Sequence, residues 1–248
     1  MIIRCAVSDD AKTLKVSVWR GSGRRGDYDL FRVPARDNQT VLDVVSWIQQ
    51  SIDPTLSYRY ACRVGMCGSC AMMVNGQPRW TCRTHVGRVV TDGKLSIGPL
   101  RNLPVIKDLV VDMDPFFDKW IEAGGVHAAS RSRAEPIEQI SPQAPGRAAA
   151  NRAIECINCA VCHAACDTVA ANPDYLGPAA LQRAWTLFND DKVADRQAVL
   201  EGVSGSGGCL ACHSQGGCTH FCPNQLDPLS AIAGLKRATA RSFWKSGA

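Results

Sequence analysis

The sequence predicts an α+β protein in which a small mixed sheet is followed by a helical second half. Short alternating apolar segments, bounded by turn residues, fill the first hundred residues. From about Leu103 apolar residues recur at helical spacing, and thirteen cysteines gather mainly in loops of both halves. A length of 248 residues fits two domains of about 100 to 200 residues each. We therefore expect domains at residues 1–105 and 106–248.

A hairpin and a capped helix are expected near the start of the chain. Apolar and polar residues alternate over 14–18 and again over 31–33, and the glycines of 21–23 lie between these segments. Thr40 is a favourable capping residue ahead of apolar side chains at helical spacing over 41–48. One helix is therefore predicted to cross the sheet.

Two more strands complete the predicted sheet. Residues 71–74 are apolar and lead into Asn75-Gly76, a strong signal for a tight hairpin turn. Residues 94–97 alternate polar and apolar side chains and supply the last strand.

The second half is predicted to be helical around one long loop. Apolar spacing predicts a helix over 103–120, whereas residues 123–149 have turn composition without a period and predict an exposed connection. An amphipathic helix is expected over 178–188, and a final helix begins at Pro228.

Composition excludes several classes of protein. Hydrophobic residues make up 46% and charged residues 21%, with a mean hydropathy of -0.10, which is typical of globular proteins and not of disordered, collagen-like or multi-span membrane chains. The net charge of +5 is spread out, without a basic and aromatic groove, so no nucleic acid is expected as a partner. No signal peptide pattern and no apolar window of about 18 residues is present, so we expect residence in a reducing cytoplasm. Thirteen cysteines there indicate cluster or metal binding rather than disulfides.

The first cysteine group has the spacing of a plant-type 2Fe-2S site, with four and then two intervening residues before a distant fourth cysteine. Its members are Cys62, Cys67, Cys70 and Cys82. Gly65 and Gly68 allow the positive-φ turns that direct backbone N-H groups toward an anionic cluster. A structural zinc ion with four cysteine ligands is the alternative for this group.

Two further runs have the spacing of bacterial ferredoxins, in which three cysteines hold one cluster and the fourth ligates the other. The first run consists of Cys156, Cys159, Cys162 and Cys166. The second consists of Cys212, Cys218 and Cys222, followed by Pro223. This second run lacks one thiol of the frame, and Gln215 occupies its position.

Exchanging the fourth cysteines between the two runs predicts two clusters. The 4Fe-4S cluster is assigned to Cys156, Cys159, Cys162 and Cys222. The remaining set has three thiolates, which fits a 3Fe-4S cluster, and consists of Cys166, Cys212 and Cys218. Cys5 is expected to be a buried strand thiol, and Cys209, which falls outside the ferredoxin spacing, a free thiol rather than a ligand. The cluster frames predict a plant-type ferredoxin-like β-grasp domain followed by an α-helical domain of the bacterial ferredoxin type.

Several segments besides the cysteine frames support a family resemblance. They are residues 57–70, which begin Ser57-Tyr58-Arg59-Tyr60-Ala61-Cys62, together with 72–76, 104–113, 172–173, 177–180 and 212–214. Over nearly its whole length the chain resembles the iron-sulfur subunits of the succinate dehydrogenase and fumarate reductase family.

The resemblance implies an electron-transfer subunit without a substrate site of its own. In this family a flavoprotein partner oxidises succinate or reduces fumarate at FAD. Electrons then pass through 2Fe-2S, 4Fe-4S and 3Fe-4S clusters to quinone in a membrane anchor. The resemblance therefore implies a flavoprotein subunit, anchor subunits and quinone as partners, and a peripheral position on the cytoplasmic face of the cell membrane.

The resemblance also assigns two residues to a quinone pocket, beside departures from the family pattern. His213 matches a histidine that lines the pocket in some members, and Thr168 matches a serine there. Asp167 follows Cys166 where members usually have proline, and alanines stand where succinate-oxidising members often have tryptophan. The alternative roles are a hydrogen bond near the cluster for His213 and helix capping for Thr168.

Two other functions stay open from the sequence. The first is a soluble relative of the family that uses a thiol or another non-quinone donor, which the missing tryptophans favour. The second is a zinc-stabilised binding module without redox activity. A membrane-fraction assay distinguishes the first, and the brown colour of iron-sulfur clusters distinguishes the second.

Overall fold

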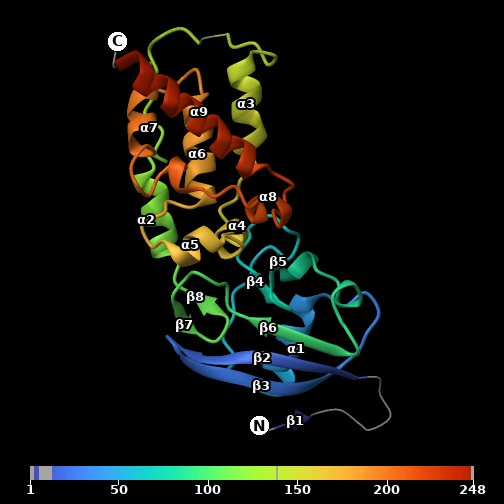
Figure 1. Cartoon of the computed structure of the whole chain (residues 1–248). Helices are drawn as coiled ribbons and strands as arrows, with labels where there is room; N and C mark the ends of the chain where they lie inside the picture. The colour runs from blue at the N-terminus through green and yellow to red at the C-terminus, as the bar shows by residue number, and fades with distance from the viewer. Residues whose placement is uncertain (1–2, 6–12, 138, 247–248) are drawn as a thin grey trace. The chain divides into compact units, whose positions relative to one another are not determined.

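The computed structural model describes residues 3–5, 13–137 and 139–246, and the chain divides into two compact units (Figure 1). The N-terminal unit comprises Met1–Met113 and the short segment Cys159–Ala164. The helical unit comprises Asp114–Asn158 and Ala165–Ala248. Each unit has its own apolar core.

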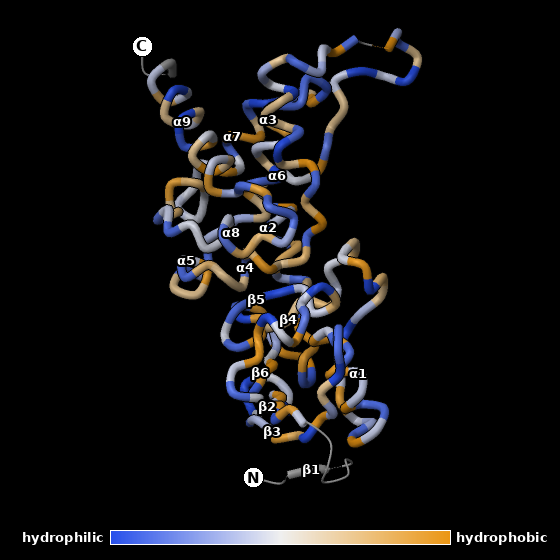
Figure 2. The backbone as a smooth tube through the Cα atoms, turned by 90° about the vertical axis from the view of Figure 1, so that its right-hand side faces the viewer, coloured by the Kyte–Doolittle hydropathy of each residue, from blue (hydrophilic) through white to orange (hydrophobic). Residues whose placement is uncertain are grey.

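A six-stranded mixed sheet forms the N-terminal unit, in the order β1-β3-β2-β6-β4-β5. Its strands are β1 (Ile3–Cys5), β2 (Thr13–Ser22), β3 (Arg25–Pro34), β4 (Ala71–Val74), β5 (Gln77–Trp80) and β6 (Lys94–Gly98). β2 pairs antiparallel with β3 and parallel with β6, whereas β4 pairs antiparallel with both β5 and β6. All four residues of β4 are buried and apolar (Figure 2). The predicted hairpins and the mixed sheet are therefore confirmed.

The single long helix of this unit, α1 (Val41–Ser51), confirms the predicted capped helix. The Thr40 hydroxyl accepts the backbone N-H of Asp43 at 3.2 Å, and the Asp43 carboxylate accepts the Thr40 N-H at 3.0 Å. This reciprocal pair satisfies two N-H groups that a helix start leaves open. The apolar face of α1 packs into the sheet core with Val16 and Phe31. Short 3-10 turns follow at Thr81–Arg83 and Val86–Arg88.

The helix predicted over 103–120 is wrong in its first half. The structure has a hairpin there, β7 (Val105–Lys107) and β8 (Val110–Val111), and the helix α2 begins only at Asp114 and ends at Glu122. Asp108 adopts a left-handed turn conformation with φ of 49°. Leu109 belongs to the sheet core, so its apolar character reflects strand packing and not a helix face.

Helices form the second unit, with α6 at its centre packed against α2, α3, α7 and α9 (Figure 1). The helices after α2 are α3 (Pro145–Ile154), α5 (Asp167–Ala171), α6 (Pro178–Phe188), α7 (Arg196–Gly202), α8 (Gly217–His220) and α9 (Pro228–Ser246). The helix α4 (Val161–Ala164) belongs to the N-terminal unit. The predictions of α6 and α9 are confirmed, but the loop predicted over 123–149 ends earlier, because Pro145 starts α3 within the first turn, where proline is favourable.

Candidate cluster sites

The loop from Cys62 to Cys70 wraps its backbone around a cysteine sulfur. The Cys62 Sγ accepts the backbone N-H groups of Met66 at 3.2 Å and of Cys67 at 3.3 Å. Gly65 and Gly68 have φ of 78° and 70°, as their place in the loop predicts. N-H groups that bond a sulfur stabilise its thiolate form. The loop therefore suits an anionic sulfur-rich cluster.

All four predicted 2Fe-2S ligands meet at this loop. Hydrogen bonds from the Cys62 backbone and the Ser69 hydroxyl lower the pKa of Cys67 to about 6. Burial, and then the neighbouring Cys70, raise the pKa of Cys82 to about 12, with a further contribution from Cys62. Cys82 comes from the 3-10 turn after β5, so two separate segments of the chain deliver the four sulfurs.

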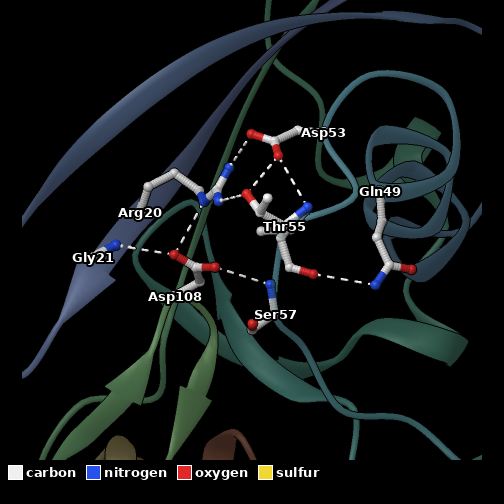
Figure 3. Close-up of polar contacts among 8 residues, drawn as sticks. Arg20, Gly21, Gln49, Asp53, Thr55, Ser57 and Asp108 are labelled. Carbon is white, nitrogen blue, oxygen red and sulfur yellow. Dashed lines mark hydrogen bonds and ion pairs between the residues drawn. The ribbon is translucent and has the colours of Figure 1, made fainter.

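A buried ion network anchors the segment that leads to Cys62 (Figure 3). Arg20 on β2 donates to the carboxylates of Asp53 at 2.6 Å and Asp108 at 3.0 Å. Asp108 also accepts the backbone N-H groups of Gly21 at 3.0 Å and Ser57 at 2.9 Å. One carboxylate thus joins β2, the β7-β8 turn and the stretch just before the cluster loop. The sequence pattern assigned no role to Asp108 or Arg20.

Asp53 remains ionised in this network. Burial of its carboxylate opposes ionisation, but hydrogen bonds from Thr55 and Arg20 outweigh the burial and lower the pKa of Asp53 to about 2. The Asp53 carboxylate therefore contributes negative charge near neutral pH, and the Arg20 guanidinium is paired with carboxylates on two sides.

We expect Asp108→Ala to destabilise the N-terminal unit by about 3 kcal/mol, because an Arg20 N-H and two backbone N-H groups lose their acceptor. In a chain of this size that loss lowers the melting midpoint by roughly 6 to 12 °C. The midpoint is read from the visible circular dichroism of the 2Fe-2S cluster during heating. Asp37→Ala, at an exposed turn, is the control and should stay within about 0.5 kcal/mol of the wild type. Equal midpoints for the two variants would contradict the anchoring role.

The three cysteines predicted to hold a 3Fe-4S cluster come together in the helical unit. Burial, followed by the nearby Cys166 and Cys212, raises the pKa of Cys218 to about 11. A Cβ atom on Gly217 would lie 2.8 Å from the Ala165 carbonyl oxygen. Only glycine allows this close approach, which brings the run before Cys218 against the residue before Cys166.

Around Cys212 the chain presents further polar groups. The Ser214 N-H donates to the Cys212 Sγ at 3.4 Å. Gln215, in the position of the missing thiol, is exposed, as is His213. Thr168 is buried in the first turn of α5, after the N-cap residue Cys166, so it does not cap that helix.

The remaining cluster set consists of Cys156, Cys159, Cys162 and Cys222. Cys156 and Cys222 lie in the helical unit, and burial followed by the charge of Cys222 raises the pKa of Cys156. The Asn224 side chain donates a hydrogen bond to the Glu155 carbonyl at 2.8 Å. This bond connects the start of the first cysteine run to the end of the second. Cys159 and Cys162 are half-buried and lie on the segment that packs with the N-terminal unit.

Two cysteines, Cys5 and Cys209, belong to none of the three predicted cluster sets. Cys209 is fully buried, its sulfur lies 3.7 Å from the Thr239 hydroxyl, and burial raises its pKa. This buried environment is compatible with the interpretation of Cys209 as a free thiol, which stays a prediction. Cys5 lies on β1, and the burial expected for its side chain falls outside what the structure describes. Among the described residues, no three His, Cys, Asp or Glu side chains are placed to hold one metal ion, whereas cluster thiolates surround several irons.

A mixed sheet with a plant-type cysteine loop, followed by helices that carry two ferredoxin-spaced runs, defines an iron-sulfur electron-transfer protein. Family models support both halves. A 2Fe-2S iron-sulfur cluster binding domain matches residues 14–118, and a 4Fe-4S dicluster domain matches residues 155–227.

The similar curated proteins are named as iron-sulfur subunits of fumarate reductase or succinate dehydrogenase. The fumarate reductase iron-sulfur subunit of Haemophilus influenzae is 33% identical over 86% of each chain, and that of Mycobacterium tuberculosis is 36% identical over the same shares. The mitochondrial succinate dehydrogenase (ubiquinone) iron-sulfur subunit 1 of Oryza sativa is 34% identical over 79% of this chain and 70% of the relative. A chain of the solved Mycobacterium smegmatis Sdh1 complex in the apo form matches with a TM-score of 0.84 and 25% identity, over 94% of this chain and 98% of its own.

The chain belongs to the family of iron-sulfur subunits of fumarate reductase and succinate dehydrogenase, and it is an electron-transfer subunit of such an oxidoreductase complex. The family expected from the resemblance, and the electron-transfer function that it implies, are confirmed. In the part of the chain that the structure describes, no helix is both long and apolar enough to cross a bilayer.

Proposed function

We propose that this chain passes electrons between an FAD flavoprotein subunit, which acts on succinate or fumarate, and quinone at a membrane anchor. The observation that supports it most is the arrangement of three separate cysteine sets on a chain of this family. The proposed ligands are Cys62, Cys67, Cys70 and Cys82 for 2Fe-2S, Cys156, Cys159, Cys162 and Cys222 for 4Fe-4S, and Cys166, Cys212 and Cys218 for 3Fe-4S.

When bound, the clusters exchange single electrons, whereas succinate and flavin exchange two. The chain itself holds the thiolates by backbone N-H groups, as at Cys62, and sets their surroundings by burial. The proposed domains are a β-grasp domain over residues 1–105 and a helical domain over 106–248. The β7-β8 hairpin beyond residue 105 packs with the sheet unit through Leu109.

The flavoprotein is proposed to contact the loop from Cys62 to Cys70. Two apolar side chains of this loop, Val64 and Met66, are 60% and 69% exposed. Exposed apolar side chains that lie together are typical of protein interaction sites. Arg63, stacked on Tyr60, adds a charged group beside them.

The anchor is proposed to contact the other end of the chain, near Cys166, His213 and Cys218, with quinone between His213 and Thr168. Exposed Phe243 and Trp244 near the end of α9 suit a lipid surface. The complex is proposed to lie on the cytoplasmic face of the cell membrane.

A soluble complex with a non-quinone donor is the second candidate, because Ala170 and Ala171 replace the tryptophans expected near a quinone. Fractionation decides between the two candidates. Quinone-linked activity in washed membranes supports the first, and activity only in the supernatant, without quinone, supports the second.

His213→Ala tests the quinone end. We expect succinate-to-quinone turnover to fall about tenfold, the effect of losing about 1.4 kcal/mol of stabilisation, because His213 is exposed beside Cys212 and available to a ligand. Turnover with an artificial acceptor at the flavin should stay unchanged. His127→Ala, at another exposed histidine, is the matched control. Unchanged quinone turnover and inhibitor sensitivity with intact clusters would show that His213 has no such role.

A further inference from the structure

The side chain of Tyr175 is an unexplained polar group in the helical unit. Tyr175 lies on the loop that connects α5 to α6. Its side chain is fully buried in the apolar cluster that contains Leu181 and Ile232. Within the described part of the chain its hydroxyl has no hydrogen-bond partner of good geometry, and the Cys212 thiol is a neighbouring hydrogen-bonding group. A buried hydroxyl without a partner costs about 1 to 3 kcal/mol, so the folded protein needs an acceptor at this point.

Tertiary contacts fix the backbone at Tyr175. Its N-H donates to the Asn172 carbonyl at 3.1 Å, and its carbonyl accepts the Lys119 ammonium at 2.8 Å. The next residue, Leu176, donates its N-H to the Gly207 carbonyl at 2.8 Å. These partners come from α2, the loop after α5 and the loop before Cys209. The backbone at Tyr175 is therefore held by a local turn and by two contacts with distant segments of the chain.

Three cysteines of the helical unit, Cys166, Cys212 and Cys218, interact with the hydroxyl. Burial, and after it the charges of Cys212 and Cys166, raise the pKa of Tyr175, and Cys218 adds to the same effect. Cys166 and Cys212 also pack against the apolar cluster that holds the ring. The unpartnered phenol O-H is thus a hydrogen-bond donor close to the three-cysteine set.

We propose that the Tyr175 hydroxyl donates a hydrogen bond to an anionic sulfur of the cluster held by Cys166, Cys212 and Cys218, and thereby raises the reduction potential of that cluster. The inference rests on the three-cysteine site of the proposed function. Reduction adds one negative charge to the cluster, and a hydrogen bond donor stabilises the more negative form. No proton is transferred in this step. Tyr175 is thus a tuning residue for the last electron acceptor in the chain.

Tyr175→Phe in the complete complex removes only the hydroxyl. We expect the midpoint of the cluster, followed by electron paramagnetic resonance during a redox titration, to fall by about 59 mV, which is a tenfold change in a one-electron equilibrium. Iron content and the 2Fe-2S midpoint should not change. Tyr28→Phe is the matched control, because Tyr28 is 44% exposed on β3 and lies in the other unit. A midpoint equal in both variants and the wild type would overturn the proposal.

A second measurement detects the hydrogen bond itself and does not depend on the potential. Electron-nuclear double resonance of the wild-type cluster should detect an exchangeable proton that Tyr175→Phe removes and Tyr28→Phe retains. A wild-type spectrum without such a proton would overturn the hydrogen bond. If fully loaded wild type shows a four-iron signal instead, the cluster type is wrong. The same downward shift, read from the reduced signal of that cluster, would still support the role of Tyr175.

Discussion

Gln215→Cys should convert the proposed three-iron site into a four-iron site, so that the oxidised 3Fe-4S resonance expected of the wild type disappears. Gln215 occupies the position at which a bacterial ferredoxin run has a cysteine. Two residues intervene between Cys212 and Gln215. It is exposed and flanked by Ser214 and Gly216, both in left-handed turn conformation, in an irregular loop and not a packed helix. We expect a cysteine at this position to supply the fourth thiolate that the proposed set of Cys166, Cys212 and Cys218 lacks.

The potential of the converted cluster should fall. The added thiolate brings negative charge to the cage, and accepting an electron becomes less favourable. Iron should rise by about one atom per chain. Gln197→Cys, an exposed position on α7 outside the frame, should leave both signal and iron unchanged. A fully loaded wild type that lacks the oxidised signal would mean that Cys209 or another group already ligates a fourth iron.

Cys82→Ala should remove the 2Fe-2S cluster and stop electron transfer through the chain. The sulfur of Cys82 is the one ligand of this set that lies outside the loop, and it interacts with Cys70 and Cys62. Without it, the loop holds three thiolates around a site that needs four. We expect a loss of about two iron atoms per chain, while the resonances of the helical unit remain.

Cys209→Ala is the matched control for Cys82→Ala, because it also removes a buried thiol. It should cost some stability through the cavity that it leaves beside Thr239, but no iron. Retention of all iron in Cys82→Ala would show that the fourth ligand is a different residue. Loss of iron in Cys209→Ala would instead show that Cys209 is a ligand.

Local signals in the sequence predicted much of the fold. The α1 helix follows from Thr40 and the apolar spacing after it, and the β4-β5 hairpin follows from Asn75-Gly76. The β7-β8 hairpin was not predictable in this way. Its turn is held by Arg20, which is 88 residues from Asp108 in sequence. Helical spacing around Leu109 therefore misled the prediction, because the partner that decides the conformation lies far away in the chain.

Candidate cluster ligands can be predicted from the sequence because a ferredoxin frame consists of short, regular cysteine spacings. The close approach at Gly217 and the buried hydroxyl of Tyr175 cannot be predicted in this way, since both depend on which segments the fold brings together. Asp108 lies within a segment that supports the family resemblance. Its hydrogen bonds from Ser57 and Arg20, however, could be found only in the structure. Residues that position a site are harder to find from sequence than residues that ligate.

Metal analysis of the anaerobically purified complex tests the central claim most directly. Counted from one cluster of each type, this chain should hold about nine iron atoms with inorganic sulfide, and little zinc. The complex should be brown. One or more zinc ions per chain with little iron, in a colourless and folded protein, would contradict the account of an iron-sulfur electron-transfer subunit.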